Sequence, residues 1–146
     1  MRAFRYTEHI ERPREQVFAY MMDLSTAPRW RNMVRRIEVI GGGPVQAGSK
    51  LLFTMDIAGK TKQGEVELWC YEPPRRFGQT NTRGGVTGVF EYVLEPNGTG
   101  TQVCFTGEIR PHGLMWLMLP LLVISSRSRF RNQLAALKRA IEQVSS

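Results

Sequence analysis

The stretch from Leu114 to Val144, LMWLMLPLLVISSRSRFRNQLAALKRAIEQV, decides the fold of this chain. Its second part is amphipathic, because apolar residues recur at spacings of three, four and seven. These residues are Leu119, Val123, Phe130, Leu134, Leu137, Ile141 and Val144. At about 100° per residue they fall within an arc of roughly 80°. The spacing predicts one long helix, whose apolar stripe needs a large apolar surface to lie on.

Pro120 interrupts the apolar run that begins at Leu114. A proline inside a helix costs roughly 3 kcal/mol or causes a kink. Either the long helix begins at Pro120, or a separate helical turn at 114–119 precedes it. A helix from Pro120 to Val144 would extend about 37 Å, enough to cross a sheet. We expect the run 114–122 to cover the sheet edge, with packing on a second copy or on a bilayer as the alternatives.

Short strand patterns precede this helix. Residues 2–11 alternate between apolar and polar and predict a first strand. Pro13 and Glu15 suit a helix start, and two short helices are predicted over 13–22 and 23–30. Six more strands are predicted, over 34–41, 51–57, 62–71, 77–82, 86–94 and 101–109. Because the connections between them are short, an antiparallel sheet is favoured. A curved sheet that grips a helix often leaves a cavity between them.

The composition is that of an ordinary globular protein, with 42% hydrophobic and 23% charged residues. No apolar stretch reaches about 18 residues, and the first residues lack the apolar core of a signal peptide. We therefore expect a single cytoplasmic domain over residues 1–146, without a transmembrane segment. Cys70 and Cys104 lack CxxC spacing, which favours two small buried hydrophobes over a zinc site or a disulfide.

The net charge is +7, and the basic residues are spread in small groups along the chain. Proteins that read nucleic acid usually concentrate their charge in a recognisable module. The sequence contains no such module, so we expect no specific nucleic-acid partner. An anionic membrane, a ribosomal surface or an acidic ligand are alternatives that suit a basic surface.

Several segments resemble one known family. The segments are IERPREQVF (10–18), the second short helix ending at Trp30, YEPPRRF (71–77), GTQV (100–103) and LAALKRAIE (134–142). In this order they resemble the START-like superfamily, and more closely its polyketide cyclase/dehydrase and lipid-transport branch. The resemblance covers essentially the whole chain. It implies an α+β helix-grip fold: a seven-stranded curved antiparallel sheet around the long C-terminal helix, with two short helices between strands 1 and 2.

In that fold, the concave sheet face and the long helix line the cavity. Period-two alternation then selects one face of each strand. The strand 62–71 is ambiguous, and we expect a bulge to bring Trp69 to the interior. The ligand-binding candidates are Trp30, Phe53, Met55, Trp69, Tyr71, Phe90, Tyr92, Phe105, Trp116, Leu119, Val123 and Arg127. Ordinary core packing is the alternative explanation for the apolar members of this set, and residues of this kind are more often plain core.

Apolar contact alone gives weak binding. A ligand that buries about 300 Å² of apolar area gains roughly 7.5 kcal/mol, and association costs on the order of 4–15 kcal/mol. A polar anchor is therefore needed. Arg127, Arg131 and Lys138 lie within about 40° of one another on a shoulder of the apolar stripe. Arg127 is the predicted partner of a ligand carboxylate or phosphate, with a solvated helix flank as the alternative. Tyr92 and Ser126 are lesser candidates.

Three functions remain open. The first is binding or carrying a hydrophobic small molecule (a lipid, an aromatic or a polyketide-like compound). The second is a cyclase or dehydratase, because some relatives use an arginine, a tyrosine and a positioned water, a set that Arg127, Tyr71 and Tyr92 could reproduce. The third is an interaction module that uses the basic surface on a membrane, a ribosome or a protein.

The sequence favours a binder over an enzyme. His9 and His112 have no partner that a sequence pattern supplies, and general acid–base catalysis needs such a group in the cavity. There is no nucleophile elbow, phosphate loop or metal-ligand spacing. We therefore expect no metal and no cofactor. Peripheral membrane contact and a homodimer remain open.

Overall fold

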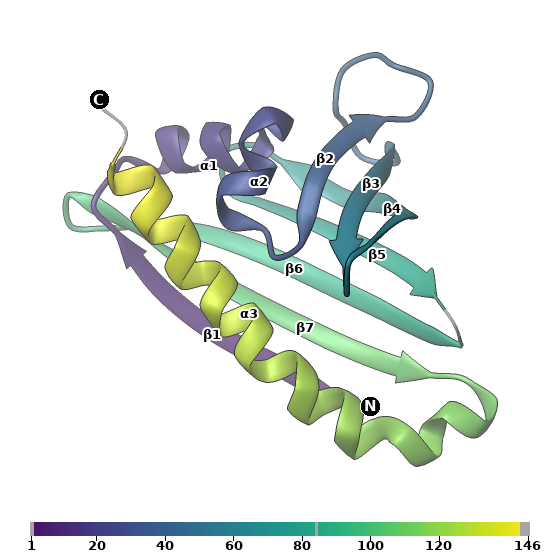
Figure 1. Cartoon of the computed structure of the whole chain (residues 1–146). Coiled ribbons are helices and arrows are strands. Elements are labelled where there is room, and N and C mark those ends of the chain that lie inside the picture. The colour runs from purple at the N-terminus through teal and green to yellow at the C-terminus, as the bar shows by residue number, and fades with distance from the viewer. Residues whose placement is uncertain (1, 84, 144–146) are drawn as a thin grey trace.

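The computed structural model describes residues 2–83 and 85–143; the side chains of residues 2, 3, 83, 119, 122–126 and 128 lie outside this description. A seven-stranded antiparallel sheet curves around one long helix (Figure 1). The strands are β1 (Arg2–Ile10), β2 (Val34–Val39), β3 (Lys50–Ile57), β4 (Lys60–Glu72), β5 (Arg76–Arg83), β6 (Val86–Asn97) and β7 (Gly100–Pro111). Their order in the sheet is β1-β7-β6-β5-β4-β3-β2.

Two short helical segments and a 3₁₀ turn join β1 to β2. They are α1 (Arg14–Met22), the turn η1 (Leu24–Thr26) and α2 (Ala27–Trp30). The chain ends with a 3₁₀ segment, η2 (Gly113–Met118), and the long helix α3 (Leu119–Glu142). This architecture confirms the predicted helix-grip fold. Most strands run one to three residues beyond their predicted ends, because hairpin residues continue the pairing.

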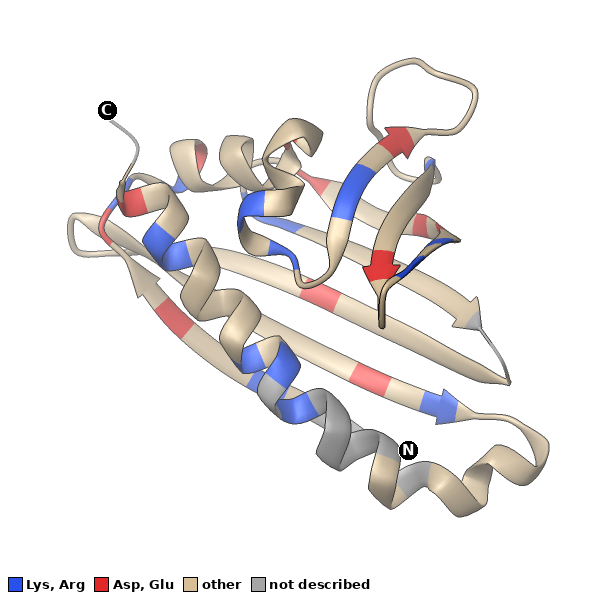
Figure 2. Cartoon of the chain, viewed as in Figure 1, with Lys and Arg blue, Asp and Glu red and all other residues tan. Residues whose placement is uncertain are grey.

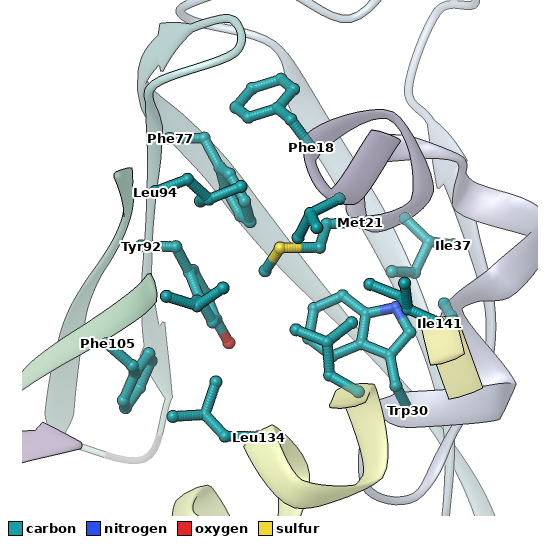
Figure 3. Close-up of a cluster of buried hydrophobic side chains, with 14 of the residues drawn as sticks. Phe18, Met21, Trp30, Ile37, Phe77, Tyr92, Leu94, Phe105, Leu134 and Ile141 are labelled. Carbon is teal, nitrogen blue, oxygen red and sulfur yellow. The ribbon is translucent and has the colours of Figure 1, made fainter. Parts of the chain in front are cut away.

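The start of α3 combines the two alternatives that the sequence left open. Pro120 lies in the first turn of α3, where the missing N–H of proline costs no helical hydrogen bond. The separate helical segment η2 precedes it. The buried stripe of α3 is formed by Leu134, Leu137 and Ile141, which pack onto the concave face of the sheet. Figure 3 shows Leu134 and Ile141 facing Trp30, Tyr92 and Phe105 in this core.

The prediction that the run 114–122 packs against the sheet edge is wrong for its described side chains. Leu114 is 85% exposed, Leu117 is 81% exposed, and Leu121 is exposed as well. The concave face is occupied by the C-terminal half of α3, so η2 lies at the rim of the sheet. Met115 is half-buried beside Gly85, whereas the other apolar side chains of η2 are exposed.

Hydrogen bonds tie the end of α3 to the end of β1. The backbone N–H of Glu11 donates to Oε2 of Glu142 at 3.0 Å. Lys138 Nζ donates to the same carboxylate oxygen at 3.1 Å and to the carbonyl oxygen of His9 at 2.6 Å. The hydrogen bond from the Glu11 backbone, followed by that from Lys138, lowers the pKa of Glu142. The ionised carboxylate of Glu142 is thus part of the hydrogen-bonded contact between α3 and β1.

The hydrogen bonds to the Glu142 carboxylate predict that the stability of the protein depends on pH. The pKa of Glu142 is lowered from an ordinary value of 4.5, so its contribution is complete above that pH and is lost as the pH falls further. We expect Glu142→Gln to lower the melting temperature by about 1–2 °C at neutral pH, the size usual for a partly exposed ion pair. The difference should vanish in acid. Thermal melts across the acid range, with the exposed Glu95→Gln as control, measure this. A difference that persists at low pH would contradict it.

Candidate functional site

A cavity of about 300 Å³ lies between the concave sheet face and α3. Strands β3, β6 and β7 contribute mainly aromatic and aliphatic residues to its wall, whereas β4, β5, the segment after α2 and α3 contribute most of the polar ones. The apolar lining residues are Met33, Val34, Phe53, Met55, Val66, Phe90, Phe105 and Phe130. The polar lining residues are Arg31, Asn32, Gln63, Glu65, Gln79, Asn81, Thr82, Tyr92, Arg129 and Gln133. The predicted hollow behind the long helix is therefore present.

Five sequence-predicted site residues line this cavity: Phe53, Met55, Phe90, Tyr92 and Phe105. All five lie on the inner faces of β3, β6 and β7, as the period-two alternation predicts. The ring of Phe90 is stacked against that of Phe105, with centroids 5.8 Å apart. These aromatic faces form the apolar floor of the cavity.

Two glycines make room for that floor. A Cβ atom on Gly88 would lie 2.7 Å from the ring of Phe90, and one on Gly107 would lie 2.9 Å from the same ring. Both distances are shorter than ordinary van der Waals contact. The missing side chains therefore allow the Phe90 ring to lie across β6 and β7.

Trp69 does not reach the interior, so that prediction is wrong. The expected irregularity exists between Leu68 and Cys70, but it leaves Trp69 on the outer face, where its side chain is 40% exposed. The indole covers Gly78 of the neighbouring strand and donates from Nε1 to the carbonyl oxygen of Phe90 at 3.3 Å. Leu68 and Tyr71 face inward on either side of the bulge.

The other predicted site residues lie away from the cavity. Tyr71 packs on Phe18 of α1, with ring centroids 5.7 Å apart. Trp30 is buried behind the cavity wall, edge-on to Tyr92. Trp116 is 50% exposed at the rim of the sheet. The side chains of Leu119 and Val123, and that of Ser126, lie outside the described residues.

Arg127 is not placed as the predicted anchor. It is exposed in a shallow depression beside β1, with Phe4, Arg5, Tyr6 and Arg131. Lys138 also faces β1, where it bonds to the backbone of His9. The shoulder of the apolar stripe therefore faces the edge strand. Consequently, the structure does not bring Arg127, Tyr71 and Tyr92 together as a catalytic set.

Two arginines line the cavity, the exposed Arg129 and the buried Arg31, and neither is among the residues predicted from the sequence. The side chain of Arg31 is buried, with its guanidinium carbon 4.3 Å from the ring centroid of Trp30 and 5.4 Å from that of Phe53. Nη1 donates to Oε1 of Gln79 at 3.3 Å, whereas Nε is buried and without a hydrogen-bond partner. Among the described residues, no carboxylate forms an ion pair with Arg31.

Burial lowers the pKa of Arg31, and the neighbouring Tyr92 opposes this shift. Arginine nevertheless stays protonated in proteins, so the cavity contains a positive charge. In sequence, Arg31 is one of several basic residues between Arg29 and Arg36, and no local pattern separates it from its exposed neighbours. A buried cation without a buried anion is unfavourable unless something supplies the opposite charge.

Tyr92 lies next to Arg31 and is held rigidly. Its ring is stacked on Phe77 at 4.7 Å and contacts Phe105 at 4.8 Å. Nε2 of Gln133 donates to the Tyr92 hydroxyl oxygen at 2.8 Å. Burial raises the pKa of Tyr92, so the phenol is neutral and keeps its proton. Among the described residues no acceptor takes that proton, which leaves it for a group inside the cavity.

Arg31 and Tyr92 are therefore two hydrogen-bond donors in the wall of the same cavity. Such a pair can bind a carboxylate, an enolate or a carbonyl oxygen and can polarise a carbonyl group. His9 and His112 line no described part of the cavity. His9 contacts Glu11, and Nε2 of His112 lies 2.8 Å from Oγ1 of Thr87.

No group of three or more His, Cys, Asp or Glu side chains is arranged to hold a metal ion in the part of the chain that the structure describes. Within the same residues, no helix combines the length and the hydropathy needed to cross a bilayer.

Solved structures share this fold. A protein from Thermus thermophilus is 20% identical with a TM-score of 0.77, and the match covers 99% of this chain and 100% of that one. The di-domain ARO/CYC BexL from the BE-7585A biosynthetic pathway is 17% identical with a TM-score of 0.82, covering 97% of this chain and 47% of that one. A START superfamily protein from Mycobacterium smegmatis is 15% identical with a TM-score of 0.75, and the match covers 98% of this chain and 99% of that one.

At these identities the structural neighbours establish the fold alone. None of the curated proteins compared matches the chain. The model of the family described as "Polyketide cyclase / dehydrase and lipid transport" matches residues 1–142, which is nearly the whole sequence. The chain therefore belongs to the polyketide cyclase/dehydrase and lipid-transport family of START-like proteins.

Proposed function

We propose that this protein binds a hydrophobic small molecule that carries an acidic or carbonyl oxygen. The apolar part of the ligand lies against Phe53, Phe90 and Phe105, and its oxygen accepts hydrogen bonds from Arg31 and Tyr92. The observation that carries this proposal is the buried guanidinium of Arg31, which faces the cavity without a carboxylate partner among the described residues.

The size and chemistry of the cavity support this class of ligand. A volume of about 300 Å³ accommodates a molecule of one to three fused rings or a short acyl chain. Hydrogen bonds to a charged group contribute about 1.5–3 kcal/mol each. An anionic ligand would therefore gain the affinity that apolar contact alone does not supply.

The proposal predicts opposite effects of one substitution on binding and on stability. Arg31→Met should weaken the binding of 2-naphthoate at least tenfold, because one charged hydrogen-bond donor is lost. The same change should raise the free energy of unfolding by about 1–2 kcal/mol, because an uncompensated buried charge is replaced by an apolar side chain of similar length. Titration calorimetry and urea unfolding measure the two quantities.

The matched control is Arg29→Met, which removes an exposed arginine two residues away. It should leave the affinity for 2-naphthoate unchanged. The neutral ligand 2-acetylnaphthalene serves as a second control, and Arg31→Met should change its affinity less than threefold. If wild-type protein binds neither compound, or if Arg31→Met leaves 2-naphthoate binding intact, the proposed anion site is wrong.

A cyclase or dehydratase is the second candidate. The donor pair of Arg31 and Tyr92 favours it, because two fixed donors at one oxygen can stabilise the negative charge that develops during condensation of a ketone. Chromatography coupled to mass spectrometry of the recovered ligand separates the two functions. A carrier returns the compound it took up, whereas a cyclase returns an isomer of equal mass with a different retention time and a dehydratase returns a product that has lost water. In the enzyme, Tyr92→Phe should slow turnover more than it weakens binding.

A further inference from the structure

The described residues carry one concentrated exposed apolar surface. Eight large hydrophobic side chains are exposed, and five of them lie within eight consecutive residues at η2 and the start of α3. We call these five the apolar rim: Leu114, Trp116, Leu117, Met118 and Leu121. Isolated exposed hydrophobic residues are normal on protein surfaces, whereas a contiguous group marks an interaction site.

Basic residues border the apolar rim. Arg127, Arg129 and Arg131 are exposed on α3, and Arg110 is exposed at the end of β7. Figure 2 shows basic residues in the middle turns of α3 and at the end of β7. No described carboxylate forms an ion pair with the three arginines of α3. Their charges are therefore available to an anionic partner.

The spacing along α3 suits a lipid surface. Arg127 follows Leu121 by six positions, which corresponds to about 9 Å along a helix. Interfacial segments bury their apolar side about 5–10 Å into the boundary between headgroups and acyl chains. With α3 along the bilayer normal and the apolar rim at that depth, Arg127 is at the level of the phosphates and Arg131, about 15 Å from Leu121, lies farther out among the headgroups. Tryptophan, here Trp116, is enriched at this boundary.

We propose that the apolar rim docks on a bilayer that contains anionic lipids. The charge distribution disfavours a second copy of this chain as the occupant, because a symmetric contact would bring Arg127, Arg129 and Arg131 close to the same residues of the partner. The net charge of +7 attracts the whole molecule to an anionic surface. This inference concerns the outer surface and does not depend on the proposed ligand site.

The docked end adjoins the cavity. The backbone N–H of His112 donates to the carbonyl oxygen of Gly85 at 2.7 Å, and a Cβ on Gly85 would lie 3.0 Å from Cγ of Met115. Gly85 connects β5 to β6, and the last residues of β5 include Asn81 and Thr82, which line the cavity. Docking therefore brings one end of the cavity close to the lipid.

Vesicle flotation tests this proposal. Wild-type protein should float with vesicles of phosphatidylcholine and phosphatidylglycerol and should not float with phosphatidylcholine alone, and added salt should reduce the binding. The double variant Trp116→Ser, Leu117→Ser should lower the partition coefficient at least tenfold, because two exposed apolar side chains are removed. Arg127→Glu combined with Arg131→Glu should also lower it at least tenfold.

Matched controls remove the same chemistry elsewhere. Ile40→Ser changes an exposed apolar residue beyond β2, and Arg36→Glu reverses a charge on β2. Ile40→Ser should float like the wild type, and Arg36→Glu should lower the partition coefficient far less than the substitutions at Arg127 and Arg131, because it changes only the net charge. Circular dichroism should show that all variants are folded. Arg31→Met should also float normally, so failure of the ligand site and failure of docking are distinguishable.

Three results would overturn the proposal. One is wild-type protein that does not float with anionic vesicles. Another is flotation that the substitutions at Trp116 and Leu117 leave unchanged. The third is a stable dimer in analytical ultracentrifugation that Leu117→Ser dissociates, since the apolar rim would then be occupied by a second copy.

Discussion

Trp30→Ala should lower the free energy of unfolding by about 3–5 kcal/mol, the range observed when large aromatic residues are removed from protein cores. Trp30 is 1% exposed, and its ring meets Tyr92 edge-on at 6.1 Å. It belongs to the cluster that joins α2 to the sheet and to α3. Because domains are stable by only about 5–15 kcal/mol, the loss is a large fraction of the total.

The two other tryptophans provide matched controls. Trp116→Ala removes a half-exposed ring at the apolar rim and should change the free energy of unfolding by less than about 0.5 kcal/mol. Trp69→Ala should have an intermediate effect, because that indole covers Gly78 and donates one hydrogen bond. Urea unfolding followed by circular dichroism measures all three. Equal losses for Trp30→Ala and Trp116→Ala would mean that Trp30 is not part of the core.

Gly100→Ala should destabilise the protein by on the order of 3 kcal/mol, the upper range for overpacking. A Cβ atom at this position would lie 2.5 Å from the backbone oxygen of Ile10 and 2.8 Å from Nε2 of His9. The backbone of Ile10 is paired with β7 at Thr101, so it can move only if the end of the β1–β7 ladder separates. The main obstacle is therefore backbone, which cannot rotate away.

Gly88→Ala is the informative comparison for Gly100→Ala. Its Cβ would meet the side-chain ring of Phe90 at 2.7 Å, and a ring beside a cavity can rotate. We expect a loss of about 1 kcal/mol, together with weaker 2-naphthoate binding because the ring moves into the cavity. Thermal and urea unfolding of both variants test this order. If Gly100→Ala lowers the free energy of unfolding less than Gly88→Ala does, the argument that a backbone obstacle costs more than a side-chain obstacle is wrong.

Alternation along the strands was sufficient to place Phe53, Met55 and Phe90 on the cavity wall. The inner face of a strand is set by period two. The irregularity in the β2–β3 pairing, between Val34 and Arg36, adds its extra residue to β2, so β3 keeps its alternation. Trp69 shows where this reasoning fails. A bulge changes the face of every following residue, and its exact position depended on the pairing of β4 with β5.

The arginine proposed to contact the ligand oxygen, which the sequence predicts as Arg127, shows a different limit of sequence reasoning. A helical wheel places Arg127 at an angle around the axis of α3, but it does not say which neighbour lies on that side. The structure has β1 there, so Arg127 faces away from the cavity. Arg31 resembles its exposed neighbours in sequence, and it is buried only because Trp30, Phe53 and the β5 residue Gln79 surround it.

The sequence by itself determined the kinds and the order of the elements, the antiparallel sheet and the apolar stripe of the closing helix. These follow from local periodicity and from turn residues, which act over a few positions. Only the tertiary structure decided which arginine lies inside the cavity, where Trp69 points and that the run 114–122 is exposed. Each of these depends on residues distant in sequence, because the burial of a side chain is determined by what packs over it.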